Sequence, residues 1–244
     1  MGLIDIHTHL LPAMDDGPQN RDLALRLAEM MVAQGVTHAV LTPHHLLADY
    51  VNPKWAVQER VVAFQSALQL AGIPLTVFPG QEVHMTGDLL NHLAADDLLF
   101  LDGVGTYLLL ELPATHVPLY TEDLLFQLTL RGIIPVLAHP ERHPVLQREP
   151  DRLEGLMRLG CLLQVTAGSY LGMFGRAAQK LATRLLASVP GVLLASDAHN
   201  HLRRPCVMAQ AFQQLASEVG LDRCRKINDN AVAVVNGESL LTGG

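Results

Sequence analysis

Short apolar runs alternate with longer segments of helical periodicity along the whole chain. The runs are rich in Val, Ile and Leu and predict seven buried strands: Leu3–Ile6, Ala39–Thr42, Leu75–Phe78, Tyr107–Glu111, Ile134–Ala138, Leu162–Thr166 and Val192–Ser196. Between most of them lies a helical segment such as Arg21–Gln34, which places Leu23, Leu27 and Met30 on one face. Strands that are covered on both faces are typical of parallel sheets. The pattern therefore predicts repeated strand–helix units.

Glycines mark the ends of several of these helical segments. Gly35, Gly72, Gly132 and Gly160 each follow a helical segment and precede a strand, where a left-handed cap belongs. No Ser/Gly-rich linker or change of composition divides the chain. We therefore expect one α/β domain over residues 1–244 that forms a closed or nearly closed barrel, with an open doubly wound sheet as the alternative.

Polar residues gather just after the predicted strands. In a βα barrel the chemistry lies at the carboxyl ends of the strands. Six of the seven ends carry His or a carboxylate, in the segments DIHTH with DDGP, TPHH, GQEVH, ELP, HPERH and DAHNH. The i, i+2 spacing of His7 and His9 lets both imidazoles reach one ion, and Asp197 and His199 repeat it.

Imidazoles and carboxylates without thiolates suit Mn²⁺, Fe²⁺ or Zn²⁺. The set is larger than one ion can use, so it predicts two or three divalent ions. Such ions lower the pKa of a bridging water and clamp phosphoryl or acyl oxygens, which favours hydrolysis. The histidines that we expect to be ligands are His7, His9, His44, His139 and His199. The carboxylates that end apolar strands, and so call for a cation partner, are Glu82, Glu111 and Asp197.

The other candidates stay open at this point. One of Asp15 and Asp16 is expected to be a ligand. His45, His84, His143 and His201 are candidates for contacts with ligands or substrate, whereas we interpret His38, His92 and His116 as ordinary residues. Arg142, Arg203 and Arg204 lie nearest the ligands in sequence, and a planar guanidinium fork matches phosphate.

Composition narrows the function further. The 24 acidic residues against 17 Lys and Arg give a net charge of −7, which argues against an extended nucleic-acid or anionic membrane surface. Three cysteines without a CxxC spacing favour a reducing cytoplasm, and a C-x5-R phosphatase loop is excluded because position 167, 212 or 230 would have to be Arg. No apolar run is long enough to span a membrane.

The segments DIHTHLLPAMDDGP, TPHH, GQEVH, LLLELP, AHPERH and SDAHN, in that order, resemble the polymerase and histidinol phosphatase (PHP) superfamily. Within it they are similar to the manganese-dependent bacterial tyrosine phosphatases of capsule and exopolysaccharide operons. The resemblance runs from residue 3 to about residue 205. It implies a distorted (β/α)7 TIM-like barrel, the PHP fold, with a trinuclear metal site.

The resemblance also implies residue roles. The metal ligands would be His7, His9, Asp16, His44, Glu82, Glu111, His139, Asp197 and His199. Arg142 and Arg204 would hold the phosphate, with Arg203 adjacent to the second, and His199 would belong to the catalytic group. His84 and His201 depart from the family pattern without removing a ligand, so they bear on substrate preference.

We therefore expect a metal-dependent protein-tyrosine phosphatase that acts by attack of a metal-bound hydroxide, with manganese favoured and iron, zinc and magnesium as alternatives. Its expected substrate is a phosphotyrosine protein, a tyrosine autokinase that regulates capsular or exopolysaccharide synthesis. The alternatives are a phosphatase of a small metabolite such as histidinol phosphate and an inactive metal-binding regulatory module. An amidohydrolase with a carboxylated lysine is disfavoured, because Lys54, Lys180 and Lys226 lie away from strand ends. The sequence predicts no oligomeric state, and from about residue 225 it predicts a short helix and a flexible end.

Overall fold

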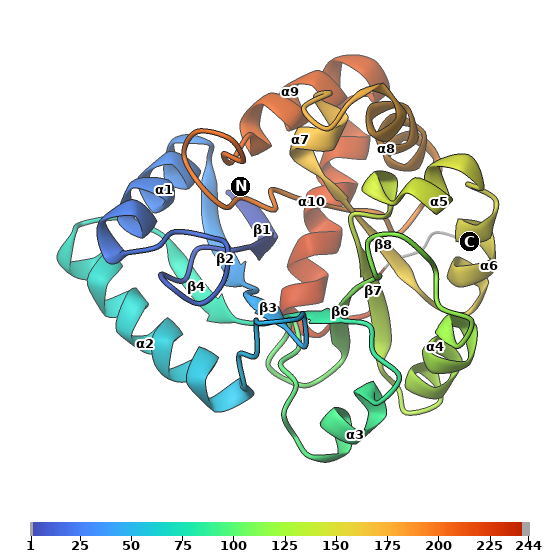
Figure 1. Ribbon diagram of the computed structural model, residues 1–244. Coiled ribbons are helices and arrows are strands. Elements are labelled where there is room, and N and C mark those ends of the chain that lie inside the picture. The colour runs from blue at the N-terminus through green and yellow to red at the C-terminus, as the bar shows by residue number, and fades with distance from the viewer. Residues whose placement is uncertain (1, 241–244) are drawn as a thin grey trace.

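Strands line the centre of the molecule and helices surround them (Figure 1). The computed structural model describes residues 2–240. The strands are β1 (Leu3–Thr8), β2 (Val36–Leu41), β3 (His44–His45), β4 (Thr76–Pro79), β5 (Glu82–His84), β6 (Tyr107–Glu111), β7 (Ile134–Ala138), β8 (Leu162–Thr166) and β9 (Leu193–Ala195). The helices are α1 (Arg21–Ala33), α2 (Lys54–Leu70), α3 (Leu89–Ala94), α4 (Thr121–Thr129), the 3₁₀ helix η1 (Pro140–Arg142), α5 (Pro144–Arg148), α6 (Arg152–Arg158), α7 (Ala167–Tyr170), α8 (Arg176–Ser188), α9 (Met208–Val219) and α10 (Leu221–Asn236).

The strands follow one another in chain order and pair in parallel. They form one sheet in the order β1-β2-β4 and a second in the order β3-β5-β6-β7-β8-β9. An isolated parallel bridge between Thr8 and Ala198 joins the end of β1 to the segment after β9. The predicted α/β fold with parallel strands is thus confirmed, and each of the seven predicted strands forms. Within residues 2–240 the hydrogen bonds make two sheets rather than one continuous closed sheet.

Two interruptions explain why there are more strands than predicted. The second predicted strand stops at Thr42-Pro43 and resumes as β3, and the third stops at Gly80-Gln81 and resumes as β5. Pro43 has no N–H to donate to a neighbouring strand, which ends the ladder there. Gly80 runs so close to β2 that a Cβ atom would lie 2.5 Å from Val40 Cγ1. The strands therefore change direction just before His44 and Glu82.

The inside of the barrel is apolar and one end of it is covered by α10. Ile6, Val40, Leu109 and Val136 belong to an inner cluster that also contains residues of α10. Helix α10 packs against β1 and β9, and Asn228 Oδ1 accepts a hydrogen bond from the Ile4 backbone N–H at 3.2 Å. The amino-terminal ends of these strands are thereby covered, and the polar residues lie at the other end.

The length of α10 corrects the prediction for the end of the chain. The sequence suggested a short helix from about residue 225, but the helix spans Leu221–Asn236. Its buried positions, Cys224, Ile227, Asn228 and Ala231, recur every three to four residues and form one packed face. The predicted flexible end falls partly on residues 241–244, which lie outside the described residues.

A second, outer core lies between the strands and the surrounding helices. Helix α1 is typical: the side chain of Asn20 caps its start by accepting from the Leu23 backbone N–H at 3.0 Å, and Ala24, Leu27 and Met31 are buried. The four predicted glycine caps all have positive φ angles, between 69° and 85°. Within residues 2–240, no helix has both the length and the apolar character that crossing a bilayer requires.

Candidate metal centre

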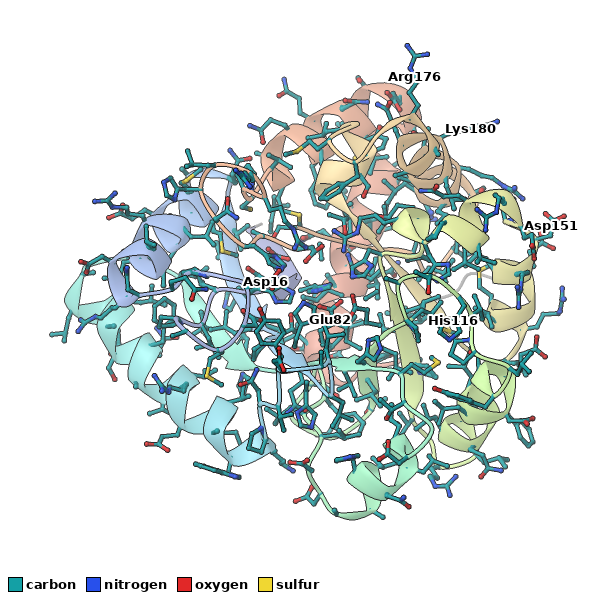
Figure 2. All side chains as sticks on the ribbon, in the orientation of Figure 1. Asp16, Glu82, His116, Asp151, Arg176 and Lys180 are labelled. Carbon is teal, nitrogen blue, oxygen red and sulfur yellow. The ribbon has the colours of Figure 1, made fainter. Side chains whose placement is uncertain are left out.

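The nine predicted ligands come together at the carboxyl ends of the strands. Each belongs to at least one of four overlapping groups in which the candidate ligand atoms lie within 4.8 Å of one another. The groups are His9, Asp16, His44 and His199; His7, Glu82 and His139; His7, His9 and Asp197; and His44, Glu82 and Glu111. Figure 2 shows Asp16 and Glu82 near the middle of the molecule, while Asp151, Arg176 and Lys180 lie at its outer edge.

Glu82 lies at the middle of this nine-residue cluster. Its Oε2 atom is 3.2 Å from His7 Nε2, 3.1 Å from His9 Nε2 and 3.0 Å from His44 Nδ1. Its Oε1 atom is 2.8 Å from His139 Nε2. One buried carboxylate is therefore within ion-binding reach of four imidazoles.

A second carboxylate, Asp197, approaches two of the same histidines. Its Oδ1 atom is 3.5 Å from His7 Nε2 and 3.4 Å from His9 Nε2. His199 Nε2 is 3.1 Å from Asp16 Oδ1, and the His199 and His9 rings are 3.8 Å apart. The cluster therefore consists of overlapping sets that share His7, His9, His44 and Glu82, as a site for more than one ion requires.

Several buried polar atoms in the cluster have no hydrogen-bond partner. They are Glu82 Oε2, Asp197 Oδ1, His44 Nδ1 and His199 Nε2. Buried polar atoms are nearly always paired, so a group of them facing one another calls for a charged ligand. Imidazole nitrogens and carboxylate oxygens suit Mn²⁺, Fe²⁺ or Zn²⁺, and the residues present fit such ions.

Electrostatics keeps two of the carboxylates and His199 in the protonation states that metals require. Burial opposes a charge on His7 and His9, but Glu82 beside His7 and Asp15 beside His9 raise the pKa of both imidazoles, so an ion that binds there competes with protons. Burial would raise the pKa of Glu82, but the imidazoles of His7 and His44 hold it well below its usual value. Burial likewise opposes the charge on Asp197, yet the guanidinium of Arg142 keeps its pKa well below the usual range. Burial and the neighbouring His9 lower the pKa of His199 to about 4. At neutral pH these carboxylates are ionised and His199 is neutral.

Two cluster residues have unusual backbone conformations. His139, directly after β7, has a φ of 34°, and Asp197, soon after β9, has a φ of 51°. Such left-handed conformations cost on the order of 1–3 kcal/mol in non-glycine residues and concentrate at functional sites. At each position the chain turns sharply out of the strand, which lets the side chain reach inward.

The structure separates the roles of Asp15 and Asp16. Asp15 Oδ2 accepts from His9 Nδ1 at 2.6 Å and from the His44 backbone N–H at 3.0 Å, so Asp15 orients two candidate ligands from behind. Asp16, half-exposed, belongs to the group with His9, His44 and His199. This placement favours Asp16 as the ligand.

Gln164 is a functional residue that the sequence reasoning missed. Gln164 lies on β8, and its Oε1 atom is 2.7 Å from His7 Nδ1. It accepts the Nδ1 proton of the neutral ring, which leaves Nε2 free to bind an ion. A polar residue in the middle of the buried run LLQVT was the available signal.

Two arginines border the cluster. Arg142 Nη1 and Arg204 Nη2 each lie 2.8 Å from Asp197 Oδ2. Arg204 Nη1 is also 3.6 Å from Asp16 Oδ2, whereas Arg203 is exposed to solvent. Arg142 and Arg204 are therefore the arginines that can share an anion with the cluster.

The remaining histidines divide between the rim and other environments. His84 Nδ1 is 3.4 Å from Glu111 Oε2, His143 Nε2 donates to the Pro113 carbonyl at 3.0 Å, and His201 is half-buried in the loop between Asp197 and Arg204. His38, His92 and His116 lie outside the nine-residue cluster.

His45 faces away from the cluster, toward Asp97 and His92. Its Nδ1 atom accepts from the Asn52 backbone N–H at 3.2 Å, which places the proton of the neutral ring on Nε2, 3.3 Å from Asp97 Oδ2. A protonated Nε2 is not available to a metal ion, so this second histidine group places a neutral imidazole beside a carboxylate and does not form a ligand set.

Comparisons with known proteins agree with this geometry. The family described as capsular polysaccharide synthesis, CpsB/CapC, matches residues 3–236. The tyrosine-protein phosphatase YwqE of Bacillus subtilis is 37% identical over 238 residues, which cover 98% of this chain and 93% of YwqE.

Solved structures extend the comparison to the fold. One similar structure comes from a study of YwqE from Bacillus subtilis and CpsB from Streptococcus pneumoniae, which are described as metal-dependent tyrosine phosphatases. It superposes on this chain with a TM-score of 0.93 at 37% identity. The match covers 98% of this chain and 96% of the other. The lactonase Lmo2620 from Listeria monocytogenes, 11% identical, has a TM-score of 0.57 over 98% of this chain and 95% of its own, which shows a shared fold alone.

Proposed function

The chain belongs to the CpsB/CapC family of capsular polysaccharide synthesis, and on that premise we propose that it is a metal-dependent phosphatase that hydrolyses phosphotyrosine in proteins. Its nearly full-length relative YwqE is a tyrosine-protein phosphatase. The observation that carries the proposal is that nine His, Asp and Glu side chains form one cluster, and that two arginines both contact one of its carboxylates, Asp197. The catalytic unit is taken to be one domain over residues 1–244.

We assign the metal ligands as the nine residues of the cluster, with two or three divalent ions. Manganese is the proposed metal, supported by a donor set of imidazole nitrogens and carboxylate oxygens. Iron and zinc accept the same donors, magnesium favours the carboxylates alone, and these three are the alternative metals. Ions bound there supply water of lowered pKa and neutralise phosphoryl oxygens.

The chain's own residues position the phosphate. The guanidinium groups of Arg142 and Arg204 meet at Asp197 Oδ2, and their side chains are 19% and 26% exposed, so an entering phosphate can reach them. Each presents a planar fork of donors that matches the oxygens of a phosphate ester. His199, neutral at pH 7, joins the catalytic group as a ligand on the same side.

The leaving group needs little help from the protein. A tyrosyl oxygen has a pKa of about 10, so it departs without strong protonation, whereas a serine alkoxide does not. The buried thiols offer no alternative nucleophile, because burial raises the pKa of Cys161 to about 12 and raises that of Cys206 further.

The proposed substrate is a tyrosine autokinase of capsule or exopolysaccharide synthesis, in keeping with the family to which the chain belongs. A cytoplasmic location is proposed with it and is supported by three free, buried cysteines.

Turnover of three substrates tests the proposal. A phosphotyrosine peptide, the matching phosphoserine peptide and histidinol phosphate are compared with added Mn²⁺ and after chelation. We expect the phosphotyrosine peptide to be hydrolysed fastest and the activity to disappear on chelation and return with Mn²⁺. Faster turnover of histidinol phosphate would make the protein a small-metabolite phosphatase, and activity that survives chelation would refute the metal site.

A further inference from the structure

We propose that Phe174 is a positioning residue for Arg142, and that the loop 171–175 is built to hold its ring against the guanidinium group. The inference rests on the proposed function, because it takes Arg142 as a phosphate-binding residue.

The contact between the two side chains is a cation–π interaction. Arg142 Cζ lies 4.8 Å from the centroid of the Phe174 ring, within the distance of about 6 Å over which a ring face attracts a guanidinium. The same guanidinium reaches Asp197 through Nη1 at 2.8 Å. Two contacts of different chemistry therefore fix the end of this side chain.

These two contacts behave differently when an anion arrives. The Asp197 carboxylate uses in-plane N–H donors of Arg142, and a phosphate competes for the same donors. Arg142 Cζ lies over the face of the Phe174 ring, which attracts the cation and offers no carboxylate-like oxygen to those donors. The cation–π contact can therefore persist while the hydrogen bonds are rearranged, and it keeps the donors aimed at the cluster.

The backbone of the loop is arranged to bring the ring into place. The Met173 backbone N–H donates to the Gly168 carbonyl at 2.9 Å, and Gly172 and Gly175 have φ angles of 85° and 88°. A Cβ atom on Gly168 would lie 3.1 Å from Phe174 Cε2, so the ring packs directly on the backbone of α7. Gly168 thus allows this close approach, and Gly172 and Gly175 allow the loop to turn.

Core packing does not account for the position of Phe174. Among residues 2–240, Phe174 belongs to neither of the two core clusters. It is also not one of the partly buried apolar side chains that pack against them. Its ring is half-buried at the rim of the site. Because this large apolar side chain packs on a guanidinium group and not in the core, its position indicates a role at that group.

Phosphate binding to the Mn²⁺-loaded protein, measured by titration calorimetry with inorganic phosphate, tests the inference without requiring turnover. Phe174→Leu keeps an apolar side chain and removes the ring, Phe174→Tyr keeps the ring, and Phe126→Leu, at a half-exposed position on α4, is the matched control. A contact of this kind is worth on the order of 2- to 30-fold in a binding constant. We expect Phe174→Leu to weaken phosphate binding about threefold to tenfold, and the other two variants to bind as the unaltered protein does, all with unchanged metal content.

A double-mutant cycle separates an effect through Arg142 from a general structural effect. In an Arg142→Gln background, Phe174→Leu should cause no further loss of phosphate binding. Equal losses in both backgrounds, an unchanged constant in Phe174→Leu, or an equal loss in Phe174→Tyr would overturn the inference. If the unaltered protein does not hydrolyse the phosphotyrosine peptide, the proposed function fails instead, and that assay is run separately.

Discussion

Replacing Gln164 with leucine should weaken metal binding while leaving all nine candidate ligands in place. Gln164 Oε1 accepts from His7 Nδ1 at 2.7 Å, which leaves Nε2 unprotonated and directed at Glu82. Without that acceptor, the His7 proton moves to Nε2, where Glu82 Oε2 lies 3.2 Å away and can accept it. The metal-free protein thereby recovers part of the lost hydrogen bond, but an ion must now displace a proton. Loss of such a partner lowers metal affinity about 10- to 100-fold, or about 1.4–2.8 kcal/mol.

The measurement is a titration of the metal-free protein with Mn²⁺, followed by direct metal binding and by recovered phosphatase activity. We expect the Mn²⁺ concentration at the midpoint to be about 10- to 100-fold higher for Gln164→Leu. At saturating Mn²⁺ its activity should recover to within a few-fold of that of the unaltered protein. Thr166→Val is the control, because Thr166 lies two residues further along β8, is equally buried, and its hydroxyl has no hydrogen-bond partner. A Gln164→Leu midpoint within a factor of two of the Thr166→Val midpoint would refute the reasoning.

Three further predictions address the arginines, the thiols and a buried acid. Arg204→Ala should lower kcat/KM for a phosphotyrosine peptide about 10- to 100-fold, while Arg203→Ala should stay within about twofold; similar losses in both would show that the assignment of Arg204 is wrong. Iodoacetamide at pH 8 should leave the native enzyme active, because burial raises the pKa of Cys161 to about 12 and Cys206 is equally inaccessible; inactivation with labelling of either thiol would contradict the metal mechanism. Burial raises the pKa of Asp5 to about 6 in the folded protein, against about 4 when unfolded, so this carboxyl costs stability increasingly as pH rises from about 4 to about 6 and fully above that. Asp5→Asn should therefore stabilise the chelated protein more at pH 8 than at pH 4.5 in denaturant melts, and a stabilisation independent of pH would disprove the link to ionisation.

Sequence reasoning located the strand ends because apolar runs and the polar residues after them are local signals. The parallel pairing then brings those ends together whatever the details of the helices, so residues as distant as His7 and Asp197 could be predicted as neighbours. The interruptions at Pro43 and Gly80 were not predicted. The break at Gly80 depends on a close approach to a neighbouring strand, which a local pattern does not contain, whereas the missing N–H of Pro43 was a local signal that was not used.

The residues that support the ligands were harder to predict than the ligands themselves. Asp15 and Asp16 are equivalent by type and position in a turn, and only the path of the chain directs one behind His9 and the other into the cluster. Phe174 lies in a loop with no periodic pattern, and its contact with Arg142 depends on two glycines with positive φ angles. Helix α10 was underestimated because its buried face includes polar Asn228, which lowers its apparent amphipathicity.

The interruptions in the second and third strands divide the barrel wall into two tiers. The lower tier, β2 and β4, is paired with β1 and contributes to the apolar interior, whereas β3 and β5 are aligned with each other, with His44 opposite Glu82. The pairing offset is the same in both tiers, with Leu41 opposite Pro79 and His44 opposite Glu82, so the lower tier sets the register in which the two candidate ligands meet. Substitutions that disturb the pairing of β2 with β4 should therefore also move His44 relative to Glu82, so that metal affinity becomes a sensitive report on the packing of the apolar tier.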